Sequence, residues 1–241
     1  MNSFIDKLLP FERDIFLALN GSDSVFWDNA MWTFTSIVAW VPILLLILYF
    51  AFKNKMLKEG VLVLGSIVLV IFLSVFLSAS FFKPLFQRFR PTHHPDFKDI
   101  VNIVNNFRGE QFGFISGHAT NSFGLAMFVS LLFKNKFVTS SIFFWALLNS
   151  YSRIYLGVHF ISDIVAGFFF GSILGLLVYE LYVSIRVGVF KVSPIEKRKS
   201  IYSIKEGNNL SIGIILIIAL IIILSPVLTS LSHSIIPESW S

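Results

Sequence analysis

The sequence contains no cysteine and few charged residues. The absence of cysteine among 241 residues excludes disulfides, thiolate metal sites and cysteine nucleophiles. Only 14% of the residues are charged, whereas a soluble domain carries about a quarter. The hydrophobic share is 55% and the mean hydropathy is +0.77. Because the apolar residues are gathered into long stretches, these values predict a polytopic membrane protein.

Six apolar stretches are candidates for helices that cross a membrane. They are residues 32–52, 60–82, 119–133, 137–155, 160–182 and 210–231. The third is short for a hydrocarbon core of about 30 Å, so we expect it to begin inside a polar face. The sequence therefore predicts an all-α bundle of about six transmembrane helices. We expect residues 1–241 to form a single membrane-embedded domain, with a core at about 60–182 and an accessory C-terminal helix at about 210–231.

The N-terminal residues predict a further helix of a different kind. Phe4, Leu8, Phe11, Ile15 and Leu19 recur at helical spacing, with charged residues between them. This pattern is typical of an amphipathic helix that lies in the membrane interface. A helix that packs on the protein's own loops would show the same pattern.

Lysine and arginine are unevenly divided between the two sides of the predicted helices. One side receives Lys53, Lys55, Lys58, Lys134, Lys136, Arg186, Lys191, Lys197, Arg198, Lys199 and Lys205. The other receives the remaining eight of the 19, which are Lys7, Arg13, Lys83, Arg88, Arg90, Lys98, Arg108 and Arg153. The positive-inside rule places the larger set in the cytoplasm. Membrane topology thus explains the net charge of +5, and no nucleic-acid partner is expected.

Three short polar clusters interrupt the apolar stretches on the side with fewer cations. They are Lys83 to Arg90-Pro91, then Ser116-Gly117-His118, then Ser152-Arg153 with His159 and Asp163. We expect this side, with both termini, to face outward, which in a bacterium is the periplasmic face of the inner (cytoplasmic) membrane. Apart from one aspartate, the clusters offer cations, which bind phosphate directly. A two-metal phosphatase would need several carboxylates or histidines around its ions. The composition of the clusters therefore predicts phosphoryl transfer without a metal.

The spacing within the clusters predicts how they are placed. Lys83 and Arg90 are seven residues apart, so in a helix they would share one face about 10 Å apart, and Pro91 would end that helix. Gly157 indicates a turn between Arg153, at the end of one helix, and His159, at the start of the next.

His159 and Asp163 are four residues apart, which puts them one helical turn apart on the same face. An aspartate there can accept the imidazole N–H and leave the other nitrogen free to attack phosphorus. His118, at an expected helix start where backbone N–H groups bind oxyanions, can protonate the leaving oxygen. Each feature alone has a plainer interpretation, because single cations near a helix end often lie in the interface. The pair is also compatible with a structural hydrogen bond or half of a metal site.

Taken together, the clusters resemble the signature of the type 2 phosphatidic acid phosphatase (PAP2) family, K-x6-RP, PSGH and SR-x5-H-x3-D. The resemblance runs from about Gly60 to Tyr182, with Ile115 in place of the motif's proline. It implies a helical bundle that needs no metal or other cofactor. It further implies roles for eight residues: phosphate binding by Lys83, Arg90, Ser116, Gly117 and Arg153, nucleophilic attack by His159, acid–base catalysis by His118, and support of the nucleophile by Asp163.

The resemblance leaves the substrate open. The N-terminal helix and two spans before the first motif look most like the members that hydrolyse undecaprenyl pyrophosphate, which we take as the leading expectation. The alternatives are lipid A, phosphatidylglycerol phosphate, or a lipid phosphotransferase with the same site. A transporter that binds phosphate without turnover is the remaining alternative. We expect the long loop from Thr92 to Ile115 to shape the choice of headgroup.

Overall fold

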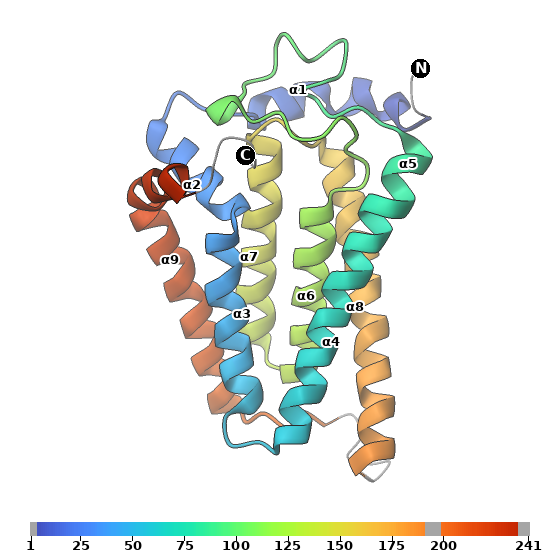
Figure 1. The fold of residues 1–241 in the computed structure, drawn as a ribbon, viewed down its shortest axis with the longest axis vertical. Coiled ribbons are helices and arrows are strands. Elements are labelled where there is room, and N and C mark those ends of the chain that lie inside the picture. The colour runs from blue at the N-terminus through green and yellow to red at the C-terminus, as the bar shows by residue number, and fades with distance from the viewer. Residues whose placement is uncertain (1–3, 191–198, 236–241) are drawn as a thin grey trace.

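The backbone forms a helical bundle capped at one end by an N-terminal helix and a long loop (Figure 1). The structure is a computed structural model and describes residues 4–190 and 199–235, within which the chain has no strand. The bundle helices are α2 (Val25–Thr35), α3 (Ile37–Phe52), α4 (Leu57–Val75), α6 (Gly117–Phe133), α7 (Lys136–Tyr155), α8 (Ile161–Phe190) and α9 (Ile204–Ile235). The shorter elements are η1 (Phe4–Leu8), α1 (Leu9–Leu19), the π-helix η2 (Phe76–Phe82), α5 (Lys83–Phe86) and η3 (Val104–Asn106). The predicted all-α fold is confirmed.

In the part of the chain that the structure describes, three helical segments are long and apolar enough to cross a membrane. They are Leu57–Phe86, which joins α4, η2 and α5, then Ile161–Val189 and Ile204–Ser230. The pair α2 and α3, bent by 52°, adds a fourth if it counts as one span. The protein is thus a membrane protein, and the exact number of six spans stays a prediction. Helix α6 has only 17 residues and buries most of them against other helices, so it makes little contact with lipid.

The predicted first span is broken where the sequence suggested one continuous helix. Ser36 ends α2 and caps α3, because its hydroxyl donates to the carbonyl oxygen of Thr33 at 2.8 Å and accepts from Val38 N–H at 3.3 Å. The amide of Ala39 then bonds to Ser36 rather than to the carbonyl of Thr35. The break therefore leaves the carbonyl oxygen of Thr35 available to another group.

Helices α6 and α8 approach so closely that only glycine fits at their contact. A Cβ atom added at Gly171 would lie 2.4 Å from the carbonyl oxygen of Thr120, and one at Gly175 would lie 2.3 Å from that of Gly124. One at Gly167 would lie 3.0 Å from the carbonyl oxygen of Ser116. Small residues every four positions allow this kind of backbone contact between membrane helices. The contact brings the start of α6 against the start of α8.

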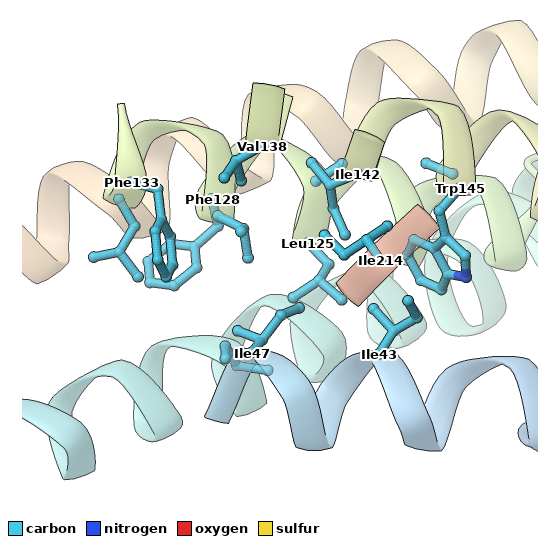
Figure 2. Packing of buried hydrophobic residues seen from close by; sticks show 14 of the residues in the cluster. Ile43, Ile47, Leu125, Phe128, Phe133, Val138, Ile142, Trp145 and Ile214 are labelled. Atoms are coloured by element: carbon cyan, nitrogen blue, oxygen red, sulfur yellow. The ribbon is translucent and has the colours of Figure 1, made fainter. Parts of the chain in front are cut away.

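The apolar core fills the space between α3, α6, α7 and α9. Figure 2 shows Ile43 and Ile47 of α3 pointing toward Leu125 of α6, with Trp145 of α7 and Ile214 of α9 beside them. All five side chains are fully buried. This core keeps the helix ends at one end of the bundle in fixed positions.

Helix α1 crosses the end of the bundle at which α6 and α8 begin (Figure 1). Its Phe16 is fully buried, with ring centroids 5.2 Å from Phe160 and 5.9 Å from Phe97. Phe11 and Ile15 are exposed, at 80% and 57%. Helix α1 therefore packs on the protein's own loops through Phe16 and Leu19, whereas Phe11 and Ile15 of the predicted apolar stripe stay exposed. Contact of that stripe with the membrane interface stays a prediction.

The described members of the larger cation set lie at the opposite end, where α3, α6 and α8 end and α4, α7 and α9 begin (Figure 1). Glu59 of α4 pairs there with Arg186 of α8 at 3.3 Å, and Lys55 pairs with Glu206 at 3.0 Å. Three members of the predicted set, Lys191, Lys197 and Arg198, lie outside the described residues.

Candidate active site

All three polar clusters meet at the end of the bundle that α1 covers. The first cluster follows α4 and η2, the second begins α6, and the third joins α7 to α8. The first and third clusters touch through the side chains of Arg90 and His159. The second and third clusters touch through the backbone N–H of Ser116, which donates to the carbonyl oxygen of Asp163 at 3.2 Å. The eight residues singled out from the sequence thus lie at one end of the bundle.

His159 is held on both sides of its ring. Its Nδ1 atom lies 3.2 Å from Oδ2 of Asp163, and its Nε2 atom lies 2.8 Å from Nη1 of Arg90. A carboxylate only accepts hydrogen bonds and a guanidinium only donates them, so the proton sits on Nδ1 and Nε2 carries the lone pair. The predicted His159–Asp163 contact is confirmed. Oδ2 of Asp163 also accepts the backbone N–H of Phe160 at 3.0 Å, which caps the start of α8.

The surroundings of His159 favour its neutral form. The residue lies in the connection between α7 and α8, outside both helices. Burial lowers the pKa of the imidazole well below its usual range, and the positive charges of Arg90 and Arg153 lower it further. A neutral imidazole keeps a lone pair on Nε2, which can act as a nucleophile once this atom no longer accepts from Arg90.

Two buried arginines have donor groups to spare. Arg90 donates from Nη1 to the carbonyl oxygen of Val158 at 2.9 Å, and Arg153 donates from Nη1 to the hydroxyl of Thr35. The Nε atoms of both arginines are buried and have no hydrogen-bond partner among the described residues. A buried N–H without a partner is costly. These two N–H groups can therefore be satisfied by the oxygens of a bound phosphate.

The expected shared helix of Lys83 and Arg90 is wrong. Helix α5 ends at Phe86, because Gln87 adopts a left-handed conformation with φ of 44°. The chain then pairs with the far end of its own loop, where Arg90 N–H donates to Gln111 O at 3.0 Å. Lys83 follows the π-helix η2 within the continuous helical segment Leu57–Phe86. Its ammonium group forms an ion pair with the carboxylate of Glu110 at 2.7 Å. The loop, rather than a helix face, places Arg90 beside His159.

The second cluster forms the first turn of α6. The hydroxyl of Ser116 caps the helix by accepting from Ala119 N–H at 3.4 Å. The backbone N–H groups of Gly117 and His118, which come before Ala119, are those that a helix start offers to an oxyanion. Nε2 of His118 lies 3.2 Å from the carbonyl oxygen of Thr35, which the break between α2 and α3 makes available. Arg153 donates to the hydroxyl of the same threonine, so His118 and Arg153 are linked through Thr35.

Four residues of the site were not expected from the sequence. Arg88, Glu12, Glu110 and Gly113 all contact residues of the three clusters. Arg88 carries a signal, since it is a cation two positions before Arg90, but sequence reasoning assigned it no role beyond that of a cation on the outward side. The others are brought in by tertiary contacts alone. Within the described residues, no group of three or more histidine, aspartate or glutamate side chains is arranged to hold a metal ion.

Comparison with known proteins agrees with this geometry. Residues 59–186 match the PAP2 superfamily. The chain is 44% identical over 182 residues to a lipid A 4'-phosphatase of Porphyromonas gingivalis, covering 76% of this chain and 77% of that protein. It is 42% identical over 176 residues to a lipid A 4'-phosphatase of Bacteroides thetaiotaomicron, covering 73% and 78%.

A solved structure is similar as well. The crystal structure of Aquifex aeolicus LpxE superposes with a TM-score of 0.55 at 26% identity, covering 70% of this chain and 95% of that one. The family match spans all three clusters, and the two curated relatives align over about three quarters of their length. The chain therefore belongs to the PAP2 superfamily, and it is a membrane-embedded lipid phosphatase.

Proposed function

We propose that the protein removes a phosphate group from lipid A through a phosphohistidine intermediate on His159. The observation that carries the chemistry is the position of the His159 imidazole between Asp163 and Arg90. The identity to two lipid A 4'-phosphatases supports lipid A as the substrate. These relatives favour what the sequence alone offered as an alternative over undecaprenyl pyrophosphate, the leading expectation.

The first step transfers the phosphoryl group to the protein. Nε2 of His159 attacks phosphorus, so that an N–P bond forms as the bond from phosphorus to the lipid oxygen breaks. His118 gives a proton to that oxygen, and the lipid leaves as an alcohol. In its protonated form His118 can keep one N–H on the carbonyl oxygen of Thr35 while the other N–H serves as the acid.

The second step returns the protein to its first state. A water molecule attacks phosphorus, gives a proton to His118 and displaces Nε2 of His159, so the N–P bond breaks and inorganic phosphate leaves. Lys83, Arg90 and Arg153 neutralise the phosphoryl oxygens in both steps, with the N–H groups at the start of α6. Electrostatic stabilisation of this kind is usually the largest contribution to such a reaction.

A cavity beside His118 suits the lipid part of the substrate. It has a volume of about 380 Å³ and opens between α3, α4 and α6. Its lining is apolar, with Ile37, Trp40 and Leu44 on α3 and Ile71 on α4, whereas His118 and Thr35 lie at its polar end. An acyl chain in this cavity would keep its phosphate near the histidines, which supports a lipid substrate over a soluble ester.

The cation distribution supports a location in the inner membrane with the site on the periplasmic side. The end of the bundle opposite the site carries the described members of the larger cation set, which the positive-inside rule assigns to the cytoplasm. Cysteine labelling of an exposed loop position with a membrane-impermeant maleimide tests this, because the chain has no cysteine of its own. Labelling of Asp99→Cys, at an exposed position of the loop from Thr92 to Ile115, is expected from outside intact spheroplasts, and protection of that cysteine would contradict the orientation.

The assay for the function is phosphate release by the purified protein in mixed micelles. Lipid A, undecaprenyl pyrophosphate and phosphatidylglycerol phosphate are compared by kcat/KM, and lipid A is expected to be the best substrate. His159→Ala should abolish release while the protein still purifies from membranes, with His93→Ala as the matched control. Full activity in His159→Ala would reject the nucleophile, and preference for another lipid would reject the substrate.

A further inference from the structure

Arg88 is fully buried and surrounded by carboxylates. Its Nη1 atom lies 2.7 Å from Oδ1 of Asp163, its Nη2 atom 2.6 Å from Oε1 of Glu12, and its Nε atom 3.2 Å from Oδ1 of Asp6. Its guanidinium also lies 4.5 Å from the ring centre of Phe160. The cost of burying an arginine is smallest when its charge is paired and its donors make hydrogen bonds. Here the Nε, Nη1 and Nη2 atoms of Arg88 each lie against a carboxylate oxygen.

The three carboxylates come from two distant parts of the chain. Asp6 and Glu12 belong to the N-terminal elements η1 and α1, and Asp163 belongs to the first turn of α8. Glu12 also contacts α8 directly, because its Oε2 accepts the backbone N–H of Ser162 and its Oε1 accepts the hydroxyl of Ser162, both at 2.8 Å. Helix α1 is thus fastened to the start of α8 through Glu12 and through Arg88.

The network ends on the nucleophile. Asp163 presents Oδ1 to Arg88 and Oδ2 to His159 and to the backbone N–H of Phe160. With both oxygens engaged, the carboxylate has one orientation in which it can hold Nδ1 of His159. Partners behind a catalytic group fix its orientation in this way, and their loss typically costs about 10- to 100-fold in comparable metal sites.

We propose that Glu12 of the N-terminal helix is a positioning residue for the nucleophile, which it orients through Arg88 and Asp163. The proposal rests on the proposed function in one respect, the role of His159. It makes α1 a part of the catalytic arrangement, in addition to any contact of its exposed face with lipid. The charges permit a clean test. Arg88 faces three carboxylates, so removing the charge of Glu12 still leaves the arginine paired with Asp6 and Asp163.

The test compares Glu12→Gln with Asp14→Asn, a matched loss of one negative charge on the exposed side of the same helix. Glu12→Gln is expected to lower kcat on lipid A about 10- to 100-fold and to leave KM within about twofold. Asp14→Asn is expected to keep both constants. Arg88→Lys should lower kcat too, because an ammonium cannot reproduce the planar fork that joins the carboxylates.

Orthovanadate binding gives a readout that a purely structural role would not change. Vanadate accepts a fifth ligand and so reports on attack by the imidazole, whereas inorganic phosphate reports on the anion site alone. Calorimetry should show weaker vanadate binding to Glu12→Gln by about the same factor as the fall in kcat, with phosphate binding unchanged. An equal loss of affinity for vanadate and phosphate in Glu12→Gln would indicate a disordered site and overturn the proposal. Vanadate affinity in Glu12→Gln equal to that of the wild-type protein would overturn it too.

The two proposals fail in different ways. If the wild-type protein releases no phosphate from lipid A, the proposed function is rejected, yet vanadate binding still tests the positioning by Glu12. If the wild-type protein turns over lipid A and Glu12→Gln does so at the same rate, the inference is rejected and the function stands. Thermal unfolding of each variant in the same detergent confirms that folded protein is compared.

Discussion

The ammonium of Lys83 lies 2.7 Å from a carboxylate oxygen of Glu110, so a cation expected to bind phosphate is already paired with an acid of the loop that covers the site. This hydrogen bond from Lys83, together with the lysine's charge, lowers the pKa of Glu110, which keeps its carboxylate ionised. The Glu110 side chain is 76% exposed. A substrate phosphate must therefore compete with Glu110 for Lys83.

Glu110→Gln is expected to strengthen inhibition by inorganic phosphate about two- to fivefold, because exposed ion pairs contribute about 0 to 1 kcal/mol. The measurement is the inhibition constant of phosphate at low and at high salt, and the gain should shrink as salt screens the pair. Asp99→Asn removes an exposed acid from the same loop and serves as the control. Equal inhibition of all three proteins would show that Glu110 does not compete.

The pH dependence should follow the neutral form of His159. Protonation of Nε2 removes the lone pair that attacks phosphorus. Burial and the nearby arginines lower the pKa of His159 below its usual value of 6.5, so the active form persists as the pH falls through 6.5. After correction for ionisation of the phosphate ester, the acidic limb of kcat/KM is expected below pH 6.5. A limb at or above 6.5 would contradict this assignment.

The parts of the site that depend on residues close together in the sequence were predictable from the sequence. The contact of His159 with Asp163 agrees with their spacing, although His159 lies just before α8 and not on the same helical face as expected. The turn between Arg153 and His159 follows from Gly157, whose φ is +72°. The position of Arg90 was not predictable, because it is set by pairing with Gln111 across the loop. A helix and a loop both satisfy the same seven-residue spacing, and only the tertiary contact decides between them.

The same distinction holds for the fold. The apolar stretches became helices, since long runs of apolar residues have few other structures available in a membrane. Those expected at 60–82, 119–133 and 137–155 lie close to their expected bounds, whereas α8 continues to Phe190 and α9 begins at Ile204. The break at Ser36 was missed because its capping bonds compete with a helix that the surrounding apolar residues favour. The spacing of Gly167, Gly171 and Gly175 in the sequence could have indicated the close contact of α8 with α6.

Replacement of His118 should have an effect that depends on the leaving group. His118→Ala is expected to lower kcat on lipid A by about 100- to 10,000-fold, the usual contribution of a general acid. A p-nitrophenyl ester needs little protonation of its leaving oxygen, so the loss in the first step should be much smaller with p-nitrophenyl phosphate. The comparison uses kcat/KM, which does not include the second step, in which His118 takes a proton from water. Equal losses of kcat/KM with both substrates would assign His118 to binding rather than to proton transfer in the first step.

Metal removal should leave activity unchanged. The expected phosphate ligands are cations and N–H groups, which take the place that divalent ions hold in metal-dependent phosphatases. Dialysis against EDTA followed by assay in chelated buffer is expected to retain the wild-type rate. Loss of activity that returns with Mg²⁺ would refute the metal-free site.

Gly113 offers a test of how tightly the nucleophile is held. A Cβ atom at this position would lie 3.1 Å from Oδ2 of Asp163, 3.2 Å from Cγ of Arg90 and 3.4 Å from Nδ1 of His159. Gly113→Ala must therefore displace these groups by a few tenths of an ångström. A misplacement of about 1 Å can cost about 100-fold, so we expect kcat to fall about 3- to 10-fold.

The control for this substitution is Gly65→Ala in α4, where an added Cβ atom meets nothing within 4 Å. This variant should keep the wild-type kcat and gain slightly in stability, because alanine favours a helix over glycine. Gly113→Val should lower kcat further than Gly113→Ala, since a larger side chain displaces the His159–Asp163 pair more. Wild-type kcat in both Gly113 variants would mean that the loop moves away at little cost and does not hold the pair.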